Sequence, residues 1–196
     1  KAEILPYLER LRDEVALPIL YVSHSMAEVA RLATTLVLIE AGRVTAAGPA
    51  ATLLADPAAA PALGLREAGA ILTGRIAAQE ADGLTRLETA AGPLWLPRVA
   101  AAPGATLRLR ILAQDVMLAT TRPEGISALN ILPAIVQELR LGDGPGALVQ
   151  LDAGGERLLA RITRRSAAAL NLAPGSPVFA VLKAVSVAQE NVGSGA

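Results

Sequence analysis

Apolar positions near the start of the chain follow two different periods. In the first segment they recur every three or four residues, with charged residues between them, which predicts an amphipathic helix over Lys1–Val15. The apolar positions of that helix are Ile4, Leu8, Leu11 and Val15. After Pro18 the run Ile19–Val22 is short and continuously apolar, which is typical of a fully buried strand.

Alternating helix and strand patterns continue from this point and indicate an α/β unit. The further elements predicted are a helix over Met26–Ala33, a buried strand over Leu36–Ile39, its hairpin partner over Val44–Ala47 and a short helix over Pro49–Ala55. Ser25 can cap the second helix, with Glu28 as its capping-box partner. His24 then stands at the carboxyl end of the first strand, where open α/β sheets bind ligands.

From Gly69 onward the pattern changes to short strands separated by turns, which predicts an all-β barrel or sandwich. The candidate strands are Ile71–Ala77, Thr85–Thr89, Leu94–Pro97, Leu107–Ile111 and Val116–Ala119. The pattern then repeats, because residues 71–76 match residues 131–136 and Pro103-Gly104 matches Pro174-Gly175. Two copies of a β unit of this kind predict a pair of small five-stranded barrels of the OB type, with a helical turn after Arg164 in the second copy.

The expected fold class is therefore α+β, with a segment of an α/β domain followed by a tandem OB-type barrel domain. We expect the α/β segment at 1–55, a linker at 56–68, the first OB unit at 69–122, the second at 123–190 and a frayed tail at 191–196.

Composition narrows the possible functions. The net charge is zero and aromatic residues make up 2% of the chain, which argues against a nucleic-acid surface. Cysteine is absent, so disulfides and thiolate metal sites are excluded, and a single His makes a zinc site improbable. There is no apolar run of the eighteen residues that a membrane span needs.

Residues 19–48 resemble the last part of the nucleotide-binding domain of ABC transporter ATPases. Val22-Ser23-His24-Ser25 resembles the switch loop of that family, and Gly42-Arg43-Val44 with Gly48 resembles its closing hairpin. The resemblance implies that His24 contacts the γ-phosphate of MgATP, and an imidazole can donate a hydrogen bond to a phosphate oxygen. Taken alone, His24 would be interpreted as a structural histidine whose ring nitrogens form hydrogen bonds at the end of a strand.

Other motifs of that family are not found in the sequence. There is no phosphate-binding loop of the G-x-x-x-x-G-K-[ST] type, no apolar run ending in Asp-Glu and no Leu-Ser-Gly-Gly signature. The chain also begins at Lys1, within a predicted helix. We therefore expect a C-terminal piece of a longer ATPase, which should not hydrolyse ATP by itself.

Three segments of the second β copy resemble the molybdate-binding Mop (TOBE) type of OB domain: Ser127-Ala128-Leu129-Asn130 at its start, Ile162–Ser166 in its middle and Lys183–Val187 at its end. The resemblance implies that the anion ligands are Ser127, Thr163, Ser166, Lys183 and the backbone of Ala184. Asn130 also matches the motif, with a role that can be structural. No metal ion is expected to be coordinated directly.

The residue types suit a tetrahedral dianion such as molybdate or tungstate. Hydroxyls, backbone N–H groups and one Lys supply many hydrogen-bond donors and little formal charge. Each residue can also be interpreted without anion binding. Ser127 can lie in a turn, Thr163 on a strand and Lys183 in solvent, and Ser166 can cap a helical turn.

Two departures from the motif matter. Leu129 occupies the position of the family's Arg, a strong oxyanion donor. The first copy has Leu112 where the second has Lys183, so we expect the first copy to be structural or to bind an anion only through the residues of a partner.

The two resemblances occur in the order found in the ATP-binding subunit of a bacterial molybdate importer. They imply a homodimer that works with integral-membrane permease subunits, lies in the cytoplasm on the inner face of the plasma membrane, and senses molybdate or tungstate. Two alternatives stay open: a stand-alone molybdate-storage module, and an ATPase subunit of a sugar or sulfate importer.

Overall fold

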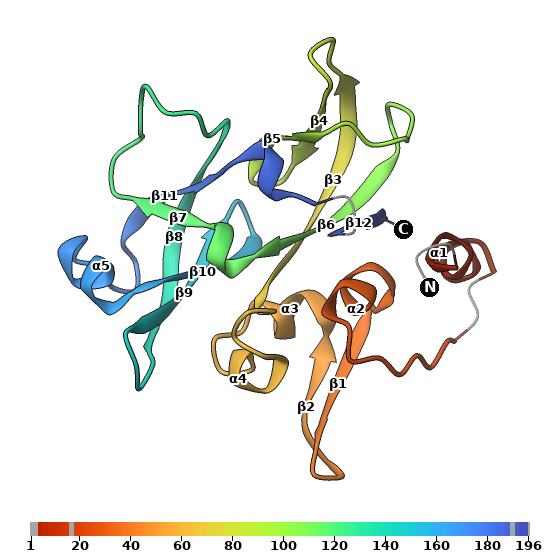
Figure 1. The fold of residues 1–196 in the computed structure, drawn as a ribbon, viewed down its shortest axis with the longest axis horizontal. Coiled ribbons are helices and arrows are strands. Elements are labelled where there is room, and N and C mark those ends of the chain that lie inside the picture. Colours follow the sequence, from red (N-terminus) through yellow and green to blue (C-terminus); the bar gives the residue numbers. More distant parts are fainter. Residues whose placement is uncertain (1–3, 16–17, 189–190, 196) are drawn as a thin grey trace.

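The computed structural model describes residues 4–15, 18–188 and 191–195. Its first part contains helices α1 (Leu5–Val15), α2 (Met26–Leu32), α3 (Ala50–Leu54) and α4 (Ala60–Leu63), with strands β1 (Thr35–Glu40) and β2 (Arg43–Pro49). The strands form a two-stranded antiparallel sheet that projects from the rest of the molecule (Figure 1). Ala41 and Gly42, both with positive φ, make the tight turn between them, so the predicted hairpin is confirmed.

The predicted buried strand at residues 19–22 is wrong. The segment forms no strand and belongs to no sheet of the described residues, and Leu20 and Val22 are 95% and 89% exposed. A strand is buried only where neighbouring strands and helices cover it. Nothing in the described part of the chain covers this segment in that way.

Burial along α1 also differs from the sequence prediction. The apolar positions Ile4, Leu11 and Val15 are exposed, whereas Leu5 and Glu9 are buried. The face of the helix that carries Leu5 and Glu9 packs against α2. There, Glu9 Oε1 accepts a hydrogen bond from Arg31 Nε at 2.7 Å. In β1, likewise, Leu36 is buried while Val37 and Ile39 are exposed, because a two-stranded sheet covers one face only.

The first β unit follows α4, and all five of its predicted strands are confirmed. It comprises β3 (Gly69–Gln79), β4 (Leu84–Thr89), β5 (Gly92–Pro97), β6 (Thr106–Leu112), the 3₁₀ turn η1 (Ala113–Asp115) and β7 (Met117–Ala119). Alternating residues such as Leu72, Leu87 and Leu109 point into the barrel core and are fully buried.

The second unit repeats this order. It comprises β8 (Asn130–Leu141), β9 (Gly146–Ala153), β10 (Glu156–Thr163), α5 (Arg164–Ala169), β11 (Pro177–Leu182), the 3₁₀ turn η2 (Ala184–Ser186) and β12 (Val192–Ser194). A bulge after Ile76 in β3 recurs after Val136 in β8, so the two long strands correspond position by position. The internal repeat inferred from the sequence is therefore present in the backbone.

The two units exchange their last strands. The sheet orders are β12-β6-β3-β4-β5 and β10-β9-β8-β11-β7, so β7 joins the second unit and β12 joins the first. The turns η1 and η2 pack on β10 and β5, respectively, again across the unit boundary. One continuous apolar core consequently runs through both units, which lie side by side in Figure 1.

Two segments expected to be irregular are ordered. Within 56–68, expected as a linker, α4 lies with Ala60 and Leu63 buried, and Glu67 Oε2 pairs with Arg110. Within the expected frayed tail, Val192–Ser194 form β12 and pair with Leu107–Leu109 of β6. The described part of the chain contains no helix long and apolar enough to span a bilayer.

Candidate functional site

One group of predicted ligands gathers where β8 begins. Asn130 pairs with Leu182 of β11, so the segment that precedes β8 lies opposite Lys183, the residue before η2. The side chains of Ser127 and Lys183 are exposed, and Ala184 is buried at the first position of η2. This end of the sheet therefore offers a hydroxyl and an ammonium group to solvent.

Asn130 has a structural role within this group. It is fully buried, its Oδ1 accepts from the Trp95 N–H at 2.7 Å, and its Nδ2 donates to the Trp95 carbonyl at 2.9 Å. Both side-chain polar atoms thus bind the backbone of β5 in the first unit. Burial keeps this amide away from an external anion, in agreement with the structural reading of the motif.

Thr163 and Ser166 form a second group at the start of α5. Thr163 is the N-cap, because its Oγ1 accepts from the Ser166 N–H at 3.0 Å, and the two hydroxyl oxygens are 2.8 Å apart. The expectation that Ser166 itself caps this turn is therefore wrong. The Thr163 side chain is exposed and that of Ser166 is half-buried.

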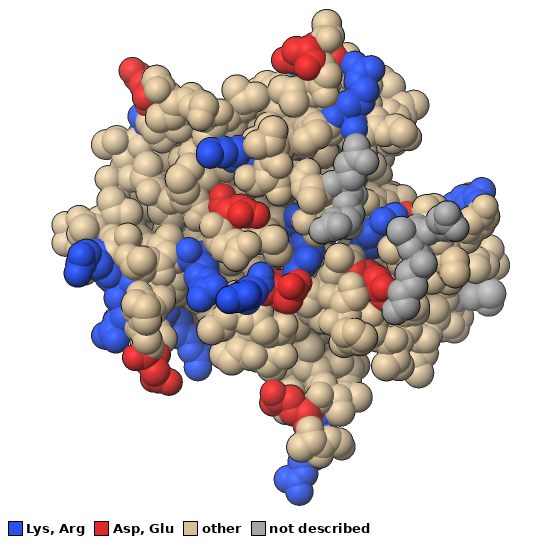
Figure 2. Space-filling view, in the orientation of Figure 1, with Lys and Arg blue, Asp and Glu red and all other residues tan. Residues whose placement is uncertain are grey.

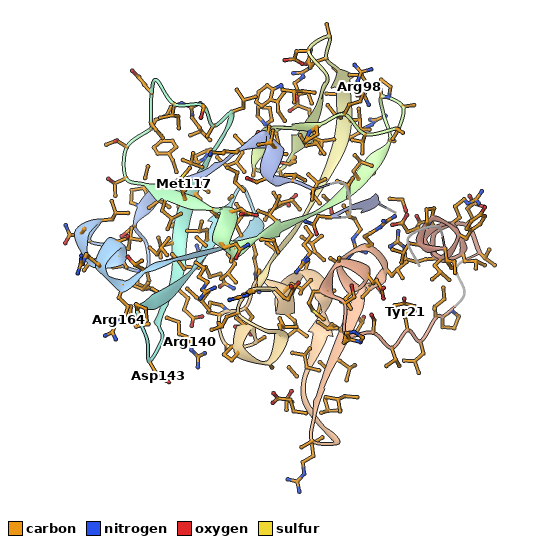
Figure 3. All side chains as sticks on the ribbon, viewed as in Figure 1. Tyr21, Arg98, Met117, Arg140, Asp143 and Arg164 are labelled. Carbon is orange, nitrogen blue, oxygen red and sulfur yellow. The ribbon has the colours of Figure 1, made fainter. Side chains whose placement is uncertain are left out.

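The two groups lie near opposite ends of β8. Lys183 follows the residue that pairs with Asn130, the first residue of β8, whereas Thr163 pairs with Gly146 of β9, beside the other end of β8 at Leu141. At about 3.3 Å per residue, on the order of 30 Å of strand separates them. Figure 3 shows Arg140 and Arg164 at one end of this sheet and Met117 toward the other.

Positive charge accompanies the second group. Arg164 and Arg165 are exposed beside Thr163, Arg161 is half-buried on β10, and Arg140 is exposed on β8. Figure 2 shows Lys and Arg side chains clustered over this part of the molecule. Among the described residues, none of these four arginines forms an ion pair within 4.0 Å.

His24 is exposed in the turn that leads into α2, directly before the N-cap Ser25. Ser25 Oγ accepts from the Glu28 N–H at 3.4 Å, which confirms half of the predicted capping box. The other half differs, since the Ser25 N–H donates to Ser23 Oγ at 3.0 Å.

The buried Glu28 carboxylate instead accepts hydrogen bonds from Ser23 Oγ at 2.6 Å and Tyr21 Oη at 2.9 Å. The hydrogen bond to Glu28 raises the pKa of the Tyr21 hydroxyl. Glu28 therefore ties the segment that precedes His24 to α2, a role that the sequence pattern did not reveal.

The first and second units differ at the residue that precedes the 3₁₀ turn. Leu112 precedes η1 as Lys183 precedes η2, so no ammonium group is present at that position. Trp95, by contrast, was missed by sequence reasoning, although it contacts Asn130 from another unit. No local signal could have found it, because the contact joins residues 35 positions apart.

The chain is similar to several known proteins. Residues 126–189 match the family described as TOBE domain. The chain is 49% identical over all of its length to "Molybdenum import ATP-binding protein ModC" of Mesorhizobium japonicum, covering 53% of that protein. It is 50% identical over 95% of its length to the protein of the same name from Rhizobium meliloti, also covering 53% of it.

Among solved structures, the cytoplasmic molybdate-binding protein ModG, with molybdate bound, superposes with a TM-score of 0.57 at 25% identity. The match covers 64% of this chain and 95% of ModG. The chain spans about half the length of the curated relatives it matches. Residues 126–189 are thus similar to TOBE domains, and the chain as a whole is similar to the molybdenum import ATP-binding proteins.

Proposed function

We propose that this chain is part of the ATP-binding, energy-coupling subunit of an ABC importer for molybdate or tungstate, and that its tandem OB domain binds the oxyanion. The observation that carries the proposal is the similarity of the whole chain to molybdenum import ATP-binding proteins, joined to a fold shared with a molybdate-binding protein. The intact subunit would hydrolyse MgATP, act with membrane permease subunits and lie on the cytoplasmic face of the membrane.

The oxyanion site is proposed to form between two copies of the chain. One copy would contribute Ser127, Lys183 and the N–H of Ala184, and the other would contribute Thr163 and Ser166. This division is supported by the position of the two groups near opposite ends of β8, which keeps one copy from surrounding a single anion.

An exposed apolar sheet face supports the same dimer. Met117, Leu129, Ile135 and Val185 are between 49% and 76% exposed, and they lie on or beside β7, β8 and η2. On β8 the alternate residues Leu132 and Val136 fill the barrel core, so Ile135 points outward. A second copy would cover this face.

The chemistry of the proposed site fits a dianion. Hydroxyl groups and backbone N–H groups donate hydrogen bonds to the four oxygens, and Lys183 supplies one positive charge. No metal coordination by the protein is needed, because the protein would contact only oxygen atoms. The described residues contain no cluster of three or more His, Cys, Asp or Glu side chains able to hold a metal ion.

For nucleotide chemistry, the residue proposed from this chain is His24. Its exposed imidazole would donate a hydrogen bond to the γ-phosphate of ATP in the intact subunit. The buried Glu28 carboxylate, through Ser23 and Tyr21, would hold the turn that presents it.

Calorimetric titration with molybdate, with sulfate and phosphate as competitors, tests the proposal. We expect selective molybdate binding that weakens at least about tenfold in Lys183→Ala, the effect of losing one charged hydrogen bond. Arg43→Ala removes an exposed cation in the β1–β2 hairpin, away from both groups, and should bind as the wild type does. Equal affinity for sulfate would favour the sulfate-importer alternative. A lack of binding at millimolar anion by folded protein would refute the oxyanion site.

A further inference from the structure

The terminal strand β12 lies between the second unit and the first part of the chain. It follows η2, where Lys183 and Ala184 are found, and pairs with β6 in the sheet of the first unit. Its outer side contacts α1 and α2, and Figure 1 shows the end of the chain beside α1. A strand that belongs to the second unit by sequence is therefore seated against the helix that follows His24.

Side chains of α1 bind β12 directly. Arg12 Nη2 donates to the Ser194 carbonyl at 3.0 Å and to Ser194 Oγ at 3.3 Å. Ser194 Oγ in turn donates to Asp13 Oδ2 at 2.9 Å. The same guanidinium reaches α2, because Arg12 Nη1 donates to the Arg31 carbonyl. Arg12 thus links the terminal strand to both helices.

The backbone of β12 also approaches α1 and α2 closely at Gly193. A Cβ atom at this position would lie 2.8 Å from Glu9 Oε1 and 3.1 Å from Arg31 Cγ. Those two side chains form the ion pair that joins α1 to α2, with 7% and 14% of their side-chain surface exposed. Only glycine fits here without displacing the ion pair.

The boundary combines an apolar cluster, in which Val29 and Ala30 of α2 pack with Ile71 of β3, with further polar contacts. Arg108 of β6 donates to the carbonyl of Ala33 at the end of α2, at 2.8 Å. Arg110 of β6 binds Glu67 and also donates to Asn191 Oδ1, at 3.3 Å. Contacts of this kind can exchange partners without exposing apolar surface, unlike the single apolar core that joins the two barrel units.

We propose that β12 couples oxyanion binding at the Lys183–Ala184 end of the second unit to the position of α2 and His24. This inference rests on the proposed function, since it assumes that an anion binds near η2. Anion binding there fixes the position of η2. Because β12 follows η2 a few residues further along the chain, its contacts with Arg12 and with the Glu9–Arg31 pair then change. Arg12, Gly193 and Ser194 are positioning residues in this scheme, and His24 is the group whose placement they set.

The chain provides a reporter at each end of the coupling. Trp95 is its single tryptophan and binds Asn130 beside the proposed anion site, and His24 is its single histidine. Molybdate is titrated while calorimetry and Trp95 fluorescence follow binding and NMR follows the imidazole resonances of His24. In the wild type we expect the His24 resonances to move with the same half-saturation as the calorimetric signal.

Ser194→Ala removes the hydroxyl that links β12 to Arg12 and Asp13, and Gly193→Ala places a methyl group against the Glu9–Arg31 pair. Both variants should bind molybdate within about threefold of the wild type and lose most of the His24 response, because coupling and local affinity are separable. Ser176→Ala is the matched control, since its hydroxyl accepts only a local N–H, from Ala173, in the loop before β11. It should respond as the wild type does.

A second measurement needs no ligand. Hydrogen exchange of the α2 amides should be roughly tenfold faster in Ser194→Ala than in Ser176→Ala, because Arg12, which donates to the Arg31 carbonyl of α2, loses its hydrogen bond to Ser194 Oγ. Molybdate binding with motionless His24 resonances, or a full His24 response in Ser194→Ala, would overturn the coupling while leaving the proposed function intact. A lack of molybdate binding would remove both.

Discussion

Replacing Asn130 with Ala tests how the two barrel units are joined. Trp95 belongs to β5, an edge strand of its sheet, and faces Arg86 of β4 in the register. In antiparallel sheets, alternate residues point their N–H and C=O groups away from the neighbouring strand. The Trp95 N–H and carbonyl point toward the second unit in this way, and the Asn130 amide satisfies both of them.

The magnitude follows from those two hydrogen bonds. Ala at position 130 leaves the Trp95 N–H and carbonyl without their partner, and each buried polar group without a partner costs about 1–3 kcal/mol. Trp95 is half-buried, so water can partly replace the amide, and we expect a loss of about 3 kcal/mol in the free energy of unfolding. For a chain of this size that corresponds to a fall in Tm of about 6–12 °C.

Urea and thermal unfolding, followed by circular dichroism, measure the effect. Gln137→Ala is the matched control, because it removes an exposed amide from the same strand, and it should change the free energy by less than about 0.5 kcal/mol. If Asn130→Ala unfolded at the same urea concentration as Gln137→Ala, the amide would not be joining the units. The structural role assigned to Asn130 would then be refuted.

Three further outcomes are expected. Leu129→Arg restores the strong oxyanion donor of the Mop motif and should tighten molybdate binding about tenfold or more, measured by calorimetry; unchanged affinity would mean that position 129 does not face the anion. Burial raises the pKa of Glu156 above its ordinary 4.5, so the folded protein holds this proton more tightly than the unfolded chain does. The protonated carboxyl therefore contributes to the free energy of unfolding below pH 4.5, and this contribution is lost as the pH rises through the raised pKa. Glu156→Gln should remove that decline, seen as a flatter dependence of the urea midpoint on pH. Gly154→Ala should destabilise the fold by about 1–2 kcal/mol more than Gly83→Ala, because both have positive φ but only the Gly154 Cβ would meet a backbone atom, the carbonyl oxygen of Ala90, at 2.2 Å; equal losses would argue against close packing at that turn.

Local pattern predicted the β units well. Alternation and turn residues found every strand from β3 to β7, and the match of residues 71–76 with residues 131–136 predicted the second copy. These signals are local, since a barrel strand alternates between core and surface whichever strand lies beside it. The strand-like pattern of Ile19–Val22 was equally clear, yet burial depends on neighbours that the described chain does not supply.

Contacts between distant residues were beyond sequence reasoning. The resemblance to the Mop motif implied that Thr163 and Lys183 are both anion ligands. Only the strand register shows that they lie near opposite ends of β8. The residues Val192–Ser194 carry too few apolar side chains to predict a strand, and β12 forms because β6 offers it an open edge.

Strand exchange makes the second unit depend on the first. Its β6 holds β12, its β5 holds Asn130 and packs on η2, and its own β7 completes the sheet of the second unit. The second unit therefore cannot form its edge strand or fix the backbone before β8 by itself. With Leu112 in place of a ligand, the first unit acts as the support that positions Lys183 and the start of β8. A substitution in its core, such as Leu94→Ala, should consequently weaken anion binding at a site formed by the other unit.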